Sequence, residues 1–164
     1  MGSTVLALVL ASALDTEAGS YTFAKIADNT GTFTKLHSPP AINPAGTVVF
    51  TADRAAGGQG IFTGSGGPLT TIAQSGGPFL SVGGNTINAD GTVVVWVTLA
   101  AGGDAIFTGN GGPLTLVADT TAGVFSSLWG RASIDAAGTV VFGGSLAAGG
   151  SGIFAGSGGP TRTI

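Results

Sequence analysis

Few side chains in this 164-residue sequence are able to do acid–base or nucleophilic chemistry. The single histidine, His37, lies in the segment KLHSPP, directly before a Pro-Pro pair, and no nucleophile-elbow pattern accompanies it. A hydrolytic triad needs a serine nucleophile and a carboxylate placed beside the histidine base. His37 is therefore interpreted as an exposed loop residue, and the chain is expected not to be an enzyme.

The carboxylates do not form a recognisable catalytic pair. A glycosidase needs two carboxyl groups roughly 5–10 Å apart. Asp28 and Asp119 hold equivalent places in different units of a repeat, with Gln74 in the unit between them, so the two carboxylates are candidates for lining one rim. Aspartate in turn segments more commonly accepts hydrogen bonds from backbone amides. Turn capping is therefore the favoured interpretation of both residues.

Asn43, Asn88 and Asp135 each stand three residues before a glycine, which is the spacing of a tight turn. The alternating oxygen ligands of a calcium loop are missing around all three. These side chains are expected to cap turns, and the sequence predicts no metal site and no cofactor.

Aromatic residues supply the candidate ligand contacts. Trp129 lies in SSLWGR, where the other units carry SVGG or KLHS, and Arg131 follows two residues later. Amphipathic aromatic side chains stack on flat ligands such as sugar rings. Trp129 and Arg131 are therefore the candidate ligand-binding residues, with a glycan as the ligand. Trp96 lies inside an apolar run and is expected to belong to the core.

The composition excludes several classes of partner. Charged residues make up 8% of the chain, against roughly 25% in ordinary soluble domains, and its five Lys and Arg residues are scattered singly. Nucleic-acid binding and attachment to anionic membranes both need clustered positive charge. Neither partner is expected, and the absence of cysteine excludes disulfides and thiolate metal sites.

One nine-residue motif occurs three times and indicates a repeat architecture. GIFTGSGGP, AIFTGNGGP and GIFAGSGGP recur, and the markers Ile42, Ile87 and Ile134 are 45 and 47 residues apart. Each unit contains four short Val-, Ile-, Phe- and Thr-rich segments bounded by Gly, Pro, Asn or Asp, which is typical of strands. The sequence therefore predicts a β domain over residues 25–164, with units at about 27–72, 73–117 and 118–164.

The apolar runs TVVF and TVVVWV barely alternate between apolar and polar residues. A sheet with one wet face would alternate, so these strands are expected to be covered on both faces. Units that pack against their neighbours meet this requirement.

The INxxGTVVF…GIFTGxGGP units resemble Gly-rich repeats of secreted bacterial proteins and, distantly, TolB-type propeller repeats. The resemblance implies an all-β fold of propeller-type blades, three complete four-stranded repeats plus an N-terminal partial unit. It also implies a binding or scaffolding role in the extracellular space or the periplasm, and it offers no catalytic residues. A β-trefoil is the alternative fold, because it too has three four-stranded repeats of about this length.

The N-terminal segment, residues 1–24, contains the apolar run Thr4–Leu14, which is too short to span a membrane as a helix. The run fits a strand of a partial blade or a donated strand, a remnant of a secretory signal, or a short helix. Closed single-chain propellers usually have at least four blades. The chain is therefore expected to be a structural or interaction scaffold that self-associates through edge blades or this segment, with a carbohydrate-binding module as the alternative.

Overall fold

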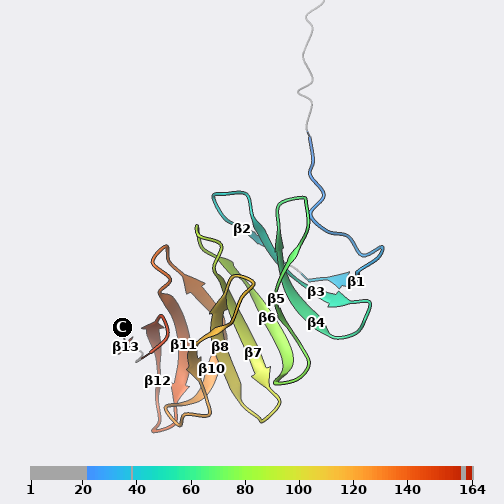
Figure 1. The fold of residues 1–164 in the computed structure, drawn as a ribbon. Coiled ribbons are helices and arrows are strands. Elements are labelled where there is room, and N and C mark those ends of the chain that lie inside the picture. The colour runs from blue at the N-terminus through green and yellow to red at the C-terminus, as the bar shows by residue number, and fades with distance from the viewer. Residues whose placement is uncertain (1–21, 38, 160–161, 164) are drawn as a thin grey trace, which may run out of the picture.

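The computed structural model describes residues 22–37, 39–159 and 162–163. All regular structure in these ranges is antiparallel β, without a helix, and it forms three sheets that we call A, B and C. Figure 1 shows the sheets side by side in chain order, with sheet B in the middle. The predicted all-β fold is confirmed. None of the three sheets closes on itself, so the propeller and its trefoil alternative remain predictions.

Each sheet is an antiparallel meander built from one stretch of the chain. Sheet A contains β1 (Phe33–Leu36), β2 (Ala41–Ile42), β3 (Val48–Arg54), β4 (Gln59–Gly64) and β5 (Thr70–Gln74). Sheet B contains β6 (Phe79–Ile87), β7 (Val93–Leu99), β8 (Asp104–Gly109) and β9 (Thr115–Asp119). Sheet C contains β10 (Phe125–Ile134), β11 (Val140–Leu146), β12 (Ser151–Gly156) and β13 (Arg162–Thr163).

The strands of sheets A, B and C lie within residues 33–74, 79–119 and 125–163. The last residues of β5 and β9 lie past residues 72 and 117, where the predicted units end. In sheet A the first edge strand is divided into β1 and β2, both of which pair with β3. Among the described residues, no helix has the length and apolar character needed to cross a bilayer.

The tight turn before each second strand explains why Asn or Asp and Gly recur at fixed spacing. In sheet A the Asn43 side-chain oxygen accepts a hydrogen bond from the Thr47 amide at 2.9 Å, and the Gly46 amide donates to the Asn43 carbonyl. Gly46 has a φ of +80°, a conformation that disfavours any residue with a Cβ. The predicted turn-capping role of the Asn and Asp residues is confirmed.

Sheet B is buried on both faces. Val93, Val95 and Val97 of β7 belong to the core shared with sheet A. Val94 belongs to the core shared with sheet C, and Trp96 packs against that core. Successive side chains of a strand point to opposite faces. The prediction that the apolar runs are covered on both sides is confirmed for this sheet.

Residues 24–28 lie beside sheet A in the way that the last strand of one sheet lies beside the next sheet. A Cβ at Gly66 would lie 3.7 Å from the Cβ of Ala24, as a Cβ at Gly111 would contact Thr70 and one at Gly158 would contact Thr115. Ile26 packs against the aromatic cluster of sheet A. The segment therefore covers sheet A as β5 covers sheet B. The expectations for Thr4–Leu14 lie outside the described residues.

A ladder of polar side chains joins the three sheets. Asn43 Nδ2 donates to the carbonyl of Asn88 at 3.1 Å, and Asn88 Nδ2 donates to the carbonyl of Asp135 at 3.2 Å. Both asparagines are only 6% exposed. Each therefore caps its own turn with its oxygen and reaches the next sheet with its nitrogen. Asp135, the third member of the series, is exposed and has no nitrogen with which to continue.

Asn88→Asp is expected to lower the free energy of unfolding by about 1–3 kcal/mol, because it removes the bond to the Asp135 carbonyl and places a carboxylate at a buried site. The acceptor for the Thr92 amide in the turn is kept, so the loss of stability gives the contribution of the ladder bond. Urea unfolding measures this free energy. The matched control, Asp135→Asn, lies at the exposed end and should change stability by less than about 0.5 kcal/mol. Equal effects of the two changes would contradict the ladder.

Candidate functional site

The three sheets differ sharply at two equivalent positions that point toward the next sheet in the series. These positions hold Val49 and Ile61 in sheet A, Val94 and Ile106 in sheet B, and Val141 and Ile153 in sheet C. The first four side chains are 0–4% exposed, because a neighbouring sheet covers them. Val141 and Ile153 are 37% and 45% exposed. Sheet C therefore presents an apolar surface that the other sheets bury.

Trp129 lies on the same surface. Phe142 belongs to the core between sheets B and C, so its neighbours Val141 and Gly143 point away from sheet B. A Cβ at Gly143 would lie only 2.0 Å from Cε3 of Trp129, so the indole ring occupies the space above this glycine. Trp129 is 45% exposed. We call the surface formed by Trp129, Val141, Gly143 and Ile153 the open face.

A bulge in β10 brings Trp129 to this surface. Leu128 is opposite Gly144 and Ala132 is opposite Phe142, so residues 129–131 together oppose the single residue Gly143. A bulge of this kind bends the strand and redirects its side chains. Strand β6 has a smaller irregularity at the corresponding place, between Gly83 and Thr86. The bulge therefore carries both predicted ligand-binding residues, Trp129 and Arg131.

A hollow of about 860 Å³ lies at the bulge. Trp129, Arg131 and Gly143 line it from sheet C, and Trp96 and Gly84 line it from sheet B. The structure thus brings Trp129 and Arg131 together in one hollow. The Trp96 Nε1 atom is buried and has no hydrogen-bond partner within the described ranges. The hollow therefore combines a partly exposed aromatic ring, a guanidinium and an unused N–H donor.

Trp96 was expected to belong to the core, and it does pack against the core between sheets B and C. Its contribution to the hollow was not expected. It shares its place in the repeat with Thr51 and Gly143, whereas Trp129 shares its place with His37 and Gly83. In sheet B the tryptophan, Trp96, lies on the second strand, opposite Gly83 of the first. In sheet C the tryptophan, Trp129, lies on the first strand, beside Gly143 of the second. Aligning the units would have revealed this exchange.

His37 lies just after β1, outside the strands as predicted, but it is half-buried and not exposed, which corrects that part of the prediction. Its Nε2 lies 2.9 Å from Oδ1 of Asp53, and its amide donates to the Thr51 carbonyl. The hydrogen bond from His37 lowers the pKa of Asp53 below its ordinary value. Among the described residues, no serine or threonine hydroxyl is bonded to His37, so the pair fixes the end of β1 against β3.

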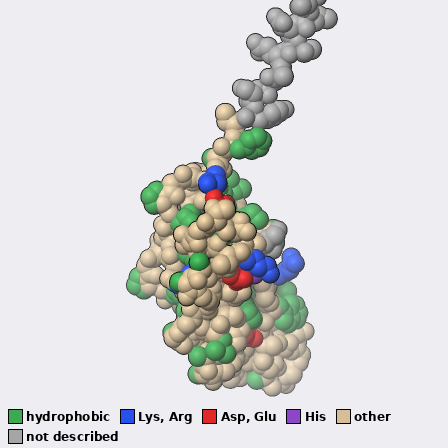
Figure 2. All heavy atoms as spheres, turned by 90° about the vertical axis from the view of Figure 1, so that its right-hand side faces the viewer, with side chains coloured by type: hydrophobic (Ala, Val, Ile, Leu, Met, Phe, Trp, Pro, Cys, Tyr) green, Lys and Arg blue, Asp and Glu red, His purple; other side chains and the backbone are tan. Residues whose placement is uncertain are grey.

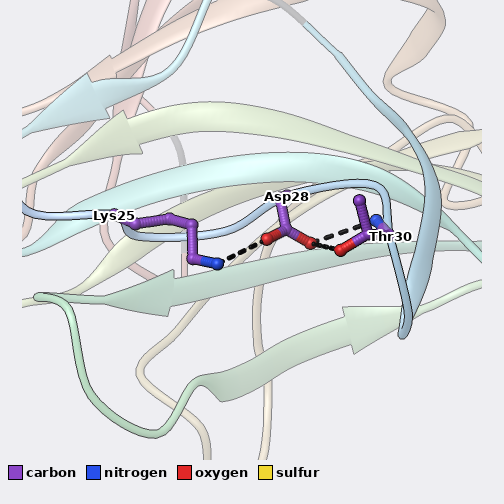
Figure 3. Close-up of polar contacts among 3 residues, drawn as sticks. All are labelled: Lys25, Asp28 and Thr30. Carbon is purple, nitrogen blue, oxygen red and sulfur yellow. Dashed lines mark hydrogen bonds and ion pairs between the residues drawn. The ribbon is translucent and has the colours of Figure 1, made fainter.

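Asp28 and Asp119 cap turns, as the favoured interpretation predicts. Figure 3 shows Asp28 between Lys25 Nζ, at 2.7 Å, and the amide and hydroxyl of Thr30. Asp119 accepts hydrogen bonds from Thr121 and Ala122 in the same way. The Lys25 hydrogen bond is the main cause that holds the pKa of Asp28 well below its usual range. The Thr121 hydroxyl is the main cause that lowers the pKa of Asp119.

Comparison of the chain with protein-family models, with curated proteins and with solved structures gave no match. The resemblance to bacterial propeller repeats therefore stays a prediction.

Gly143→Ala is expected to displace the Trp129 ring and to lower stability by about 1–3 kcal/mol, because the added methyl group overlaps the indole. In a Trp129→Ala background the same change should cost clearly less, since the clash is gone. Urea unfolding and tryptophan fluorescence measure both effects. Gly130→Ala is the matched control, because a Cβ at Gly130 meets no atom within 4 Å. Additive effects of Gly143→Ala and Trp129→Ala would refute the contact.

Proposed function

We propose that the chain is a non-enzymatic structural or interaction scaffold of propeller-type blades that associates with itself through the open face of sheet C. One observation carries the proposal. The positions held by Val141 and Ile153 are covered by a neighbouring sheet both times they occur earlier in the repeat. An apolar surface that the fold buries at two of its three occurrences is suited to receive another unit of the same kind.

The energetics favour burial of this surface. Removing apolar area from water is worth about 25 cal/mol per Å², so Val141, Ile153 and Trp129 together offer a substantial gain on contact. Contiguous exposed apolar patches on soluble proteins commonly mark interaction sites. All four open-face residues also line the hollow, and Arg131 is the one charged side chain among its described lining residues. Little desolvation of charge therefore opposes association.

A non-enzymatic role is supported by how the titratable side chains are used. His37 and Asp53 hold two strands together, and Asp28 and Asp119 hold turns. Catalytic groups are ordinarily gathered in one pocket with a substrate position beside them. The extracellular or periplasmic location proposed for the scaffold rests on the resemblance of its repeats to those of secreted bacterial proteins.

Self-association predicts a concentration-dependent oligomer that the double variant Val141→Ser/Ile153→Ser loses. Both side chains are already exposed, so the fold should survive while the apolar contact is removed. Sedimentation velocity over a wide concentration range measures the change. Leu80→Ser is the matched control, because Leu80 is 66% exposed on sheet B, away from the open face. A wild-type chain that is monomeric at every concentration would refute the proposal.

A carbohydrate-binding function is the second candidate, favoured by the composition of the hollow. The Trp129 ring offers a stacking surface, and Arg131 offers donors to sugar hydroxyl oxygens. A glycan array should then show binding that Trp129→Ala abolishes. Val124→Ala, at an exposed residue outside the hollow, should leave that binding unchanged. An array without any bound glycan would remove this candidate.

A further inference from the structure

The two ends of the stack of sheets are unlike. At the sheet A end, Phe33, Phe50 and Phe62 form an aromatic cluster with ring centroids 4.8–5.7 Å apart. These rings are at most 5% exposed, and Ile26 and Ala27 pack against them. Figure 2, viewed from this side, shows hydrophobic side chains scattered among polar and backbone atoms. The aromatic cluster at the sheet A end is therefore covered, although Leu36 and Ile42 on the same side are 41% and 66% exposed. The sheet C end presents the open face.

A head-to-tail contact between two copies would set the open face of one copy against the sheet A end of the next. In the contacts between sheets A and B and between sheets B and C, Val49 and Val94 meet apolar residues of the next sheet. At the sheet A end the aromatic cluster is already covered, and Leu36 and Ile42 are exposed. Such a contact would bury one open face together with these two side chains.

The polar ladder opposes head-to-tail continuation. Asn43 and Asn88 each donate a side-chain N–H to a carbonyl of the next sheet. Asp135 holds the same place in sheet C and has only acceptor oxygens, one of which is bonded to the Thr139 amide. A next unit in the same register would set its carbonyl opposite this carboxylate. Two acceptors facing each other at a contact are unfavourable, so the next contact differs from the two inside the chain.

We propose that two copies of this chain pack open face against open face around a two-fold axis. This inference rests on the proposed self-association and specifies its geometry. Such an isologous contact buries the same patch on both copies, and two-fold dimers are the commonest closed oligomers. Both Trp129 rings would then be buried within the contact, one on each side of the axis, and tryptophan is enriched in protein interfaces.

Charge on sheet C fits the same arrangement. Arg131 and Asp135 lie on β10 and in the turn after it, and both are exposed. Neither forms an ion pair within the part of the chain that the structure describes. When the two-fold axis is perpendicular to the strands, β10 of one copy lies opposite β10 of the partner, and the two strands run in opposite directions. Arg131 then lies toward the partner subunit's Asp135, and the pair occurs twice.

Cysteine cross-linking tests this geometry, because the chain contains no cysteine of its own. Val141→Cys and Ile153→Cys place a thiol on the open face, and Leu36→Cys places one on β1 of sheet A, where the leucine is 41% exposed. Leu80→Cys reports random collision. Each variant is treated alone with a short thiol-to-thiol cross-linker. At least one open-face variant should give several-fold more covalent dimer than Leu80→Cys.

Mixtures separate this geometry from the head-to-tail one. An open-face cysteine variant is mixed either with a size-tagged Leu36→Cys chain or with a size-tagged Leu80→Cys chain. The two mixtures should give equal amounts of cross-linked mixed dimer. If cross-linked product forms chiefly in the Leu36→Cys mixture, the contact is head-to-tail, and the two-fold proposal is wrong while self-association stands. If the wild-type chain sediments as a monomer at every concentration, both proposals fail together.

Discussion

The structure depends on the packing of thin sheets against one another. A meander of four short strands has two faces and little interior of its own, so it becomes stable only when neighbours cover it. Strand β7 shows this most clearly, because Val93, Val95 and Val97 are fully buried toward sheet A and Val94 is buried toward sheet C. Burying each such side chain contributes about 1.5–3 kcal/mol. The stack therefore gains its stability at the contacts between sheets.

Apolar packing alone would allow neighbouring sheets to slide. The asparagine ladder removes that freedom, because Asn43 and Asn88 reach the next sheet from inside a tight turn. Thr51 and Thr86 add hydroxyl bonds to the carbonyls of Gly84 and Ala132. A buried polar group that is left without its partner is costly, so each bond is available in one register only. Hydrophobic contact supplies the attraction, and these bonds determine the alignment.

The repeat made much of this fold predictable from sequence. Recurrent glycines and apolar runs located the turns and the strands, and the lack of alternation in TVVVWV indicated burial on both faces. The second role of Asn88 was not predictable, since its turn is local but its hydrogen-bond partner lies 47 residues away in another sheet. The half-buried state of His37 was missed for the same reason, because Asp53 approaches it only after β1 pairs with β3.

For the candidate site, sequence reasoning found Trp129 and Arg131 because they depart from the other units. It did not place Trp129 above Gly143, because that contact depends on a bulge whose register shift has no signature in one sequence. Three departures, Trp129, Asp135 and Gly143, all fall in sheet C, at positions that face the next sheet elsewhere in the repeat. In this stack, the face that departs from the repeat is the one that no other described sheet covers. Such differences therefore concentrate where the stack meets something else.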